Sequence, residues 1–127
     1  IGSYQAVKHH LATAQVAIEF AQPVVMAAAA DIGEQDVHSR ARVSHAKIVA
    51  LEAADKAARA SIQVHGAMGY SWEVDVHLFL KRALALAQSW GTPAFHRARI
   101  AKRLFTQPNG PDQTFARDTN IRETEHA

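Results

Sequence analysis

The sequence predicts an all-α protein folded as an antiparallel up-down four-helix bundle. Apolar residues recur at alternating steps of three and four over long segments, and glycine or proline separates these segments. The three-four spacing places apolar side chains along one stripe of a helix. Short connections between such helices favour antiparallel packing. The sequence contains no strand-period run, internal repeat or low-complexity tract.

The first predicted helix runs from about Tyr4 to Ile32, and Gly33 is a plausible stop. Pro23 lies inside it, where it removes one backbone donor and crowds the carbonyl of Glu19. We therefore expect a kink rather than a break. The predicted apolar stripe consists of Tyr4, Val7, Leu11, Ala14, Ile18, Ala21, Val25, Ala28 and Ile32.

The second predicted helix begins near Asp36, a good N-cap residue, and ends at about Val64 before Gly66 and Gly69. Its many alanines permit a neighbouring helix to approach closely. The predicted stripe consists of Ala41, Ser44, Ile48, Leu51, Ala54, Ala58 and Ile62.

The third predicted helix starts after Ser71, with Glu73 and Asp75 in its first turn, where acidic groups suit the helix dipole. Its predicted stripe consists of Val76, Phe79, Ala83, Leu86 and Trp90.

Gly91-Thr92-Pro93 predicts the end of one helix and the cap and first residue of the next. The fourth helix should run to about Phe105, with Phe95, Ala98, Ala101 and Phe105 facing inward. The polar stretch 107–127 contains two prolines and a glycine, and we expect a mobile tail there. The predicted bundle domain is therefore 1–106.

Composition indicates an ordinary globular domain, with 48% hydrophobic and 20% charged residues. A formal charge of +2 is too small to favour nucleic acid. No apolar stretch approaches the ~20 residues that span a bilayer, so no membrane partner is expected. The absence of cysteine excludes disulfides and fits a reducing, cytoplasmic location. Because the chain starts at Ile1 without methionine, we expect a fragment or a processed product.

The eight histidines do not predict a metal site. His9 and His10 are adjacent and point in different directions on a helix. Glu73, Asp75 and His77 are spaced by two, which also scatters them. No Glu-x-x-His pair typical of di-iron bundles occurs, so solvated or capping histidines are expected.

The other charged residues do not identify a catalytic residue. The basic run from His96 to Arg103 is predicted to be a solvated helix face, with a phosphate-binding patch or a subunit contact as alternatives. No aromatic residues interleave on that face to support base stacking. Glu52 and Asp55 lie three residues apart and are interpreted as surface charges.

The segment from Gln63 to Tyr70 is more informative. A helix ending in Gly-x-x-Gly presents a turn whose N–H groups can approach a phosphate closely, because glycine lacks a Cβ. Without further context, an ordinary interhelical turn is the default interpretation.

Several segments, in the right order, resemble the C-terminal helical domain of flavin-dependent acyl-CoA dehydrogenases over almost the whole of 1–105. Some features also resemble an actinobacterial branch acting on steroid or other bulky CoA thioesters. The segments that carry the resemblance are Ile1-Gly2-Ser3-Tyr4-Gln5-Ala6-Val7-Lys8-His9, Ala46-Lys47, Gln63-x-x-Gly66-x-x-Gly69-Tyr70, Trp72-Glu73-x-Asp75-x-His77-Leu78 and Gly91-Thr92.

The resemblance implies FAD as cofactor, acyl-CoA as substrate and α,β-desaturation as the reaction. It also implies a tetramer with flavin at the dimer interface, a role in fatty acid and lipid metabolism, and electron-transfer flavoprotein as acceptor. The residues that match flavin contacts are Tyr4, Gln5, Gln63, Val64, Gly66, Ala67 and Thr92, and those that match the substrate site are Trp90 and Gly91.

The sequence departs from the family pattern at four positions. Trp90 occupies the place of the usual catalytic glutamate, and an indole cannot act as that base. Ala67, Arg82 and Ala94 replace a glycine, an aspartate and a glutamine. The chain alone is therefore expected to be inactive. Two explanations stay open: a base supplied from outside this chain, or a non-catalytic scaffold subunit in a heteromeric dehydrogenase. An unrelated ligand-binding bundle is a third, weaker alternative.

Overall fold

The computed structural model describes residues 1–33 and 37–106. Within these ranges the secondary structure is entirely helical, which confirms the predicted fold class. The elements are α1 (Gln5–Ala30), α2 (Val37–His65), the short 3₁₀ helix η1 (Gly66–Tyr70), α3 (Val76–Gln88) and α4 (Pro93–Thr106). The expectation of a tail over 107–127 lies outside the described residues.

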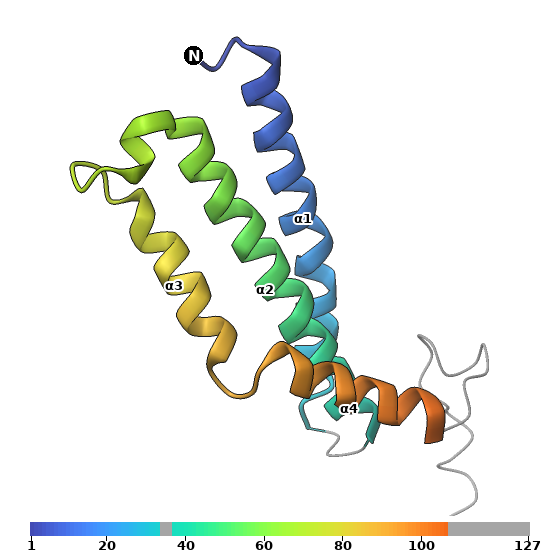
Figure 1. Cartoon of the computed structure of the whole chain (residues 1–127). Helices are drawn as coiled ribbons and strands as arrows, with labels where there is room; N and C mark the ends of the chain where they lie inside the picture. Colours follow the sequence, from blue (N-terminus) through green and yellow to red (C-terminus); the bar gives the residue numbers. More distant parts are fainter. Residues whose placement is uncertain (34–36, 107–127) are drawn as a thin grey trace, which may run out of the picture.

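Helix α2 is the centre of the fold, since it packs against α1, α3 and α4. Helices α1, α2 and α3 run alternately up and down, side by side (Figure 1). Helix α4 instead runs across the end of the bundle where α2 begins (Figure 1). The up-down arrangement therefore holds for the first three helices, and α4 crosses them.

Helix α1 continues through Pro23 without a break, as predicted. Its buried residues are Ala14, Ala21 and Ala28, which fall every seven residues on the predicted stripe. The larger stripe residues at its ends and flanks are exposed, so this part of the prediction was wrong. The reason is that, among the described residues, α1 packs mainly against α2, and one neighbour covers only a narrow line of alanines. The exposed stripe residues are Tyr4, Leu11, Val25 and Ile32.

By length and composition alone, α1 could cross a membrane, and it is the one such helix in the described part of the chain. Only 17% of its most apolar window is buried. Gln15, Glu19 and Gln22 interrupt the stretch, which explains why the sequence predicted no apolar segment of that length. Composition does not separate a membrane helix from one that packs on another protein surface.

The predicted stripe of α2 is largely confirmed, with Ser44 fully buried. Ala54 of the predicted stripe is exposed, so this position was wrong. Ala53 is buried instead, and α2 packs against three helices. After α2, η1 folds back so tightly that a Cβ on Gly69 would lie 2.5 Å from the carbonyl oxygen of Ile62. Only glycine fits this position.

Helix α3 begins at Val76, so the prediction that it starts after Ser71 with Glu73 and Asp75 in its first turn was wrong. The Ser71 hydroxyl accepts a hydrogen bond from the Glu73 amide at 3.2 Å and holds the segment in a turn. The Trp72 ring also stabilises this turn by packing edge-on against the His77 ring, with centroids 4.6 Å apart.

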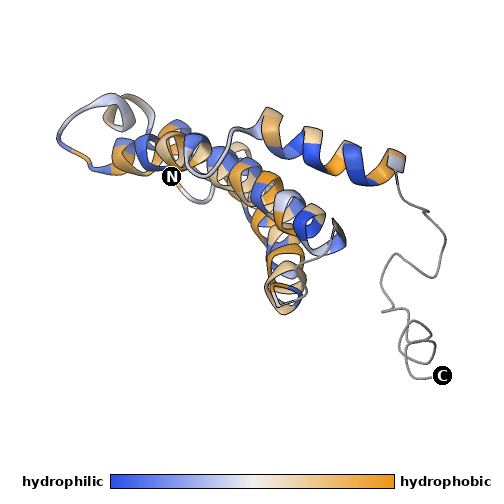
Figure 2. Cartoon of the chain, turned by 90° about the horizontal axis from the view of Figure 1, so that it is seen from below, coloured by the Kyte–Doolittle hydropathy of each residue, from blue (hydrophilic) through white to orange (hydrophobic). Residues whose placement is uncertain are grey.

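The inward face predicted for α4 was wrong, since Phe95 and Phe105 are exposed. His96 is buried instead, with only 5% of its surface accessible. Apolar periodicity gives no signal for a buried polar residue such as His96. Polar and apolar bands alternate along α4 (Figure 2).

Candidate functional site

The residues predicted to contact flavin or substrate form two groups at opposite ends of α3 (Figure 1). Tyr4 and Gln5, at the start of α1, share one end of the bundle with the segment from Gln63 to Ala67. The segment from Trp90 to Thr92 connects α3 to α4 at the other end. The 13 residues of α3 separate the two groups by about 20 Å.

The first group is centred on the turn at Gly66, whose φ of 59° is in the left-handed region. No atom lies within 4 Å of the position a Cβ would take, and the residue is exposed. Gln63 and Ala67 are also exposed, and Val64 is half-buried. No bulky side chain therefore blocks the backbone of this turn, which fits the close approach of a phosphate group.

Tyr4 and Gln5 lie at the same end of the bundle. Tyr4 is 68% exposed, and its carbonyl accepts a hydrogen bond from the Lys8 amide at 3.2 Å. Gln5, the first residue of α1, is exposed as well. Their side chains are thus available to a ligand or a neighbouring surface.

The second group contains the most unusual backbone of the described residues. Trp90 has a φ of 55°, and it is the one non-glycine residue of 1–33 and 37–106 with a positive φ. Such a conformation costs roughly 1–2 kcal/mol for a residue with a Cβ. Trp90 is 84% exposed, so the prediction that it faces inward was wrong. Strained backbone of this kind concentrates at functional sites.

Gly91 and Thr92 shape the start of α4. Gly91 has a φ of 111°, and an added Cβ would lie 2.7 Å from Cδ1 of Phe95. The Thr92 hydroxyl accepts a hydrogen bond from the Phe95 amide at 3.3 Å. The predicted cap at Thr92, with proline at the first helical position, is confirmed.

Lys47 of α2 reaches this connection, although the sequence did not indicate it as a site residue. Its Nζ donates a hydrogen bond to the Leu86 carbonyl at 2.7 Å, which places positive charge at the C-terminal end of α3. The same nitrogen lies 5.7 Å from the centroid of the Trp90 ring. No periodicity relates residues 47 and 90, so only the folded structure brings them together.

His96 was also misassigned, since it is buried rather than part of a solvated face. Its Nδ1 lies 3.1 Å from the Ser44 hydroxyl, and its Nε2 is buried without a hydrogen-bond partner. The Nε2 atom is 3.1 Å from the position of a Cβ on Gly91. The missing side chain of Gly91 therefore makes room for the imidazole ring.

The remaining basic side chains of α4 behave largely as predicted. Arg97, Arg99 and Lys102 are exposed. Arg97 lies 3.4 Å from the Glu52 carboxylate, and Arg99 covers the Phe95 ring at 4.7 Å. This face is thus exposed, and two of its arginines also contact neighbouring side chains.

Glu52 and Asp55 are surface charges, as predicted, and both pair with arginines. Asp55 raises the pKa of Arg59 through a hydrogen bond and through its charge. The two acids edge a small apolar groove of about 190 Å³ between α2, α3 and α4. Their pairing with arginines removes them as candidates for an unpaired catalytic base.

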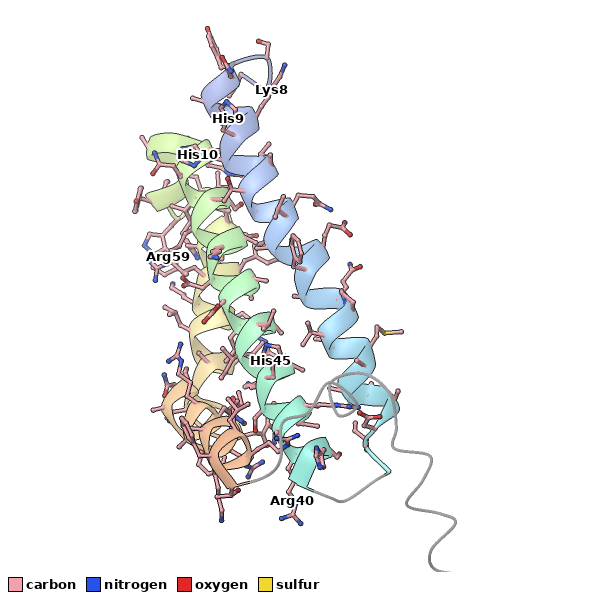
Figure 3. All side chains as sticks on the ribbon, turned by 90° about the vertical axis from the view of Figure 1, so that its right-hand side faces the viewer. Lys8, His9, His10, Arg40, His45 and Arg59 are labelled. Atoms are coloured by element: carbon pink, nitrogen blue, oxygen red, sulfur yellow. The ribbon has the colours of Figure 1, made fainter. Side chains whose placement is uncertain are left out.

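The described residues contain no group of three histidines, aspartates or glutamates that could hold a metal ion. His9 and His10 lie near the start of α1, whereas His45 lies far from them on α2 (Figure 3). The histidines labelled there thus do not converge on one point.

The sequence profile described as "Acyl-CoA dehydrogenase, C-terminal domain" matches residues 1–105, and the chain belongs to this family. The chain is 36% identical to acyl-CoA dehydrogenase IpdE2 of Mycobacterium tuberculosis over 85% of its length. It is 32% identical to IpdE2 of Mycolicibacterium smegmatis over 83% of its length. The predicted family is confirmed, and these mycobacterial relatives agree with the actinobacterial resemblance.

The matches cover only 32% of each IpdE2 protein, so the chain spans about a third of these relatives. A further relative, 32% identical over 84% of the chain, is 3-sulfinopropanoyl-CoA desulfinase of Paraburkholderia xenovorans. Related domains thus occur in proteins named for different reactions on CoA thioesters. No solved structure matches the chain significantly.

Proposed function

We propose that the chain is part of an FAD-dependent acyl-CoA dehydrogenase that introduces a double bond between Cα and Cβ of an acyl-CoA thioester. Family membership and the names of the mycobacterial relatives support this class. The observation that carries the cofactor assignment is the exposed turn at Gly66, which fits a phosphate group. When bound, FAD supplies the hydride acceptor for this reaction.

The two groups of site residues would then have separate roles. Tyr4, Gln5 and the segment Gln63–Ala67 would hold the adenine and pyrophosphate part of a flavin, since anions bind well to such turns. Thr92 would contact flavin at the other end of α3. Trp90 and Gly91 would line the acyl site. In this arrangement the flavin lies at a dimer interface, and the bundle reaches the flavin held mainly by the partner subunit.

Trp90 prevents this chain from supplying the base at the usual position, because the indole nitrogen only donates a hydrogen bond. The α proton must then pass to a carboxylate from elsewhere in the complete protein or from a partner subunit. The 127-residue chain alone should be inactive.

The surface of the bundle supports the proposed oligomer. Phe20 and Met26 on α1 are 72% and 71% exposed. Apolar side chains of this size favour burial against another protein surface. We propose a homo- or heterotetramer in the cytoplasm that acts in lipid metabolism and passes electrons to an electron-transfer flavoprotein.

A non-catalytic scaffold subunit in a heteromeric dehydrogenase is the second candidate. The missing carboxylate at Trp90 favours it, whereas the exposed turn at Gly66 favours retained cofactor contact.

Activity of the complete protein separates the two candidates. If the complete wild-type protein oxidises acyl-CoA, and an acidic residue outside residues 1–127 proves essential, the scaffold proposal fails. If wild type is inactive and Trp90→Glu in the complete protein gains activity, the scaffold proposal is supported. Enoyl-CoA formation measures both.

A further inference from the structure

We propose that Lys47 and Trp90 form a carboxylate-binding site, and that the carboxylate is a side chain from outside residues 1–127. In this assignment Lys47 is a positioning residue, which holds the external carboxylate beside the place where the family resemblance puts the catalytic base. The catalytic role of the site rests on the proposed function, whereas its binding of a carboxylate does not.

The first argument concerns the hydrogen bonds of Lys47. An ammonium group has three donors. One of them is used by the Leu86 carbonyl at 2.7 Å. The ion pairs among the described residues involve Asp31, Asp55 and Glu52 as acids, and all three have arginine partners. Lys47 is half-buried, so a partly desolvated cation with two donors to spare lacks a carboxylate within 1–33 and 37–106.

The second argument concerns Trp90. Its ring lies 5.7 Å from Lys47 Nζ, close to the limit for an attractive cation–π contact. The contact is therefore weak, and it uses neither of the two donors that remain beside the hydrogen bond to the Leu86 carbonyl. Trp90 has a positive φ and is exposed in the connection between α3 and α4.

The third argument concerns the alternative that Lys47 only caps α3. A lysine at a helix C-terminus does stabilise the helix through the terminal carbonyls. That role needs one donor and no carboxylate. A capping role therefore predicts no specific response to added carboxylate, whereas the proposed site does.

Butyrate is a suitable test ligand for the 127-residue chain. The chain has two tryptophans, so Trp72→Phe leaves Trp90 as the only indole reporter. Butyrate is titrated at constant ionic strength against chloride. We expect a saturable change in Trp90 fluorescence, and binding about tenfold weaker in Lys47→Met, since hydrogen bonds to charged groups contribute that much.

Three further variants make the result decisive. Lys47→Gln keeps a polar N–H donor but has no charge, so it should also lose the response. Lys47→Arg should retain it, and Lys56→Met, which removes an exposed lysine of the same helix, should not change it. Circular dichroism confirms the helical content of each variant. An equal response in Lys47→Gln and wild type, or no response beyond chloride, overturns the site.

The complete protein then identifies the source of the carboxylate. If a side chain of the protein or its partner fills the site, butyrate should no longer change Trp90 fluorescence there. A persistent, Lys47-dependent response would overturn that assignment. In an active assembly, Lys47→Gln should move the acidic limb of the kcat/KM profile to higher pH, because a carboxylate without its cation binds protons more readily. Loss of flavin binding would refute the proposed function but leave the butyrate result intact.

Discussion

His96 of α4 and Ser44 of α2 form a buried polar pair, with Nδ1 of the imidazole 3.1 Å from the serine hydroxyl. Ser44 is fully buried and His96 is 5% exposed. The pair therefore joins α4 to α2 inside the protein, next to Gly91 and the connection that carries Trp90.

Removing the serine hydroxyl should leave both nitrogens of His96 without a partner. We expect Ser44→Ala to lower the free energy of unfolding by about 1–3 kcal/mol. Ser89→Ala is the control, because Ser89 makes an exposed hydrogen bond to a backbone carbonyl of its own helix. Urea unfolding of the 127-residue chain measures both. Equal losses of unfolding free energy for the two variants would show that the buried pair contributes no more than an exposed hydrogen bond.

Gly91 should tolerate no side chain. In Gly91→Ala the new methyl group would lie 2.7 Å from the Phe95 ring. The backbone φ of 111° at this position is also unfavourable for alanine. We expect destabilisation by about 1–3 kcal/mol. Gly66→Ala separates the two causes, since Gly66 has a positive φ but open space around it. It should cost about 1 kcal/mol, and a loss as large as that of Gly91→Ala would argue against the steric contact.

Replacing Trp90 with glycine should relieve the strained backbone. The exposed contact with Lys47 is worth only about 0.5–1 kcal/mol, whereas the conformation costs about 1–2 kcal/mol. We therefore expect Trp90→Gly to raise the midpoint of thermal unfolding slightly. A clear decrease would mean that the indole has packing partners that its 84% exposure does not indicate.

The Gly66 turn should tolerate a larger residue without damage to the fold, but not without damage to cofactor binding. We expect Gly66→Asn to keep the helical content, because asparagine accepts positive φ. In the complete protein the same change should reduce flavin content. Gly33→Asn is the control, since no atom lies within 4 Å of its Cβ position and Gly33 has no role in the proposed flavin site. Equal flavin content in both variants would contradict a phosphate contact at Gly66.

The sequence predicted the helices well because alanine-rich stripes and glycine or proline stops are local signals. The centres of α1 and α2, with Ala14, Ala21, Ile48 and Ala58, match the buried positions. The start of α3 was wrong because a hydrogen bond to the Ser71 hydroxyl competes with a helical turn. The exposed end residues of α1 were unpredictable because periodicity indicates a stripe but not how much of it a neighbour covers.

The candidate site was predicted in its segments but not in its contacts. Thr92 and Gly91 are recognisable because caps and stops depend on neighbouring residues. The approach of Lys47 to Trp90 and the contact of His96 with Ser44 both join residues that lie far apart in the sequence. No local pattern encodes either contact, so these residues emerge only from the folded structure.

The absorbance of bound flavin in the complete protein tests the central claim most directly. The protein is purified with its partner subunit, if it has one, and acyl-CoA is added without oxygen. We predict a bound flavin whose oxidised absorbance bleaches as the thioester is desaturated. A complete assembly that binds no flavin would contradict the account.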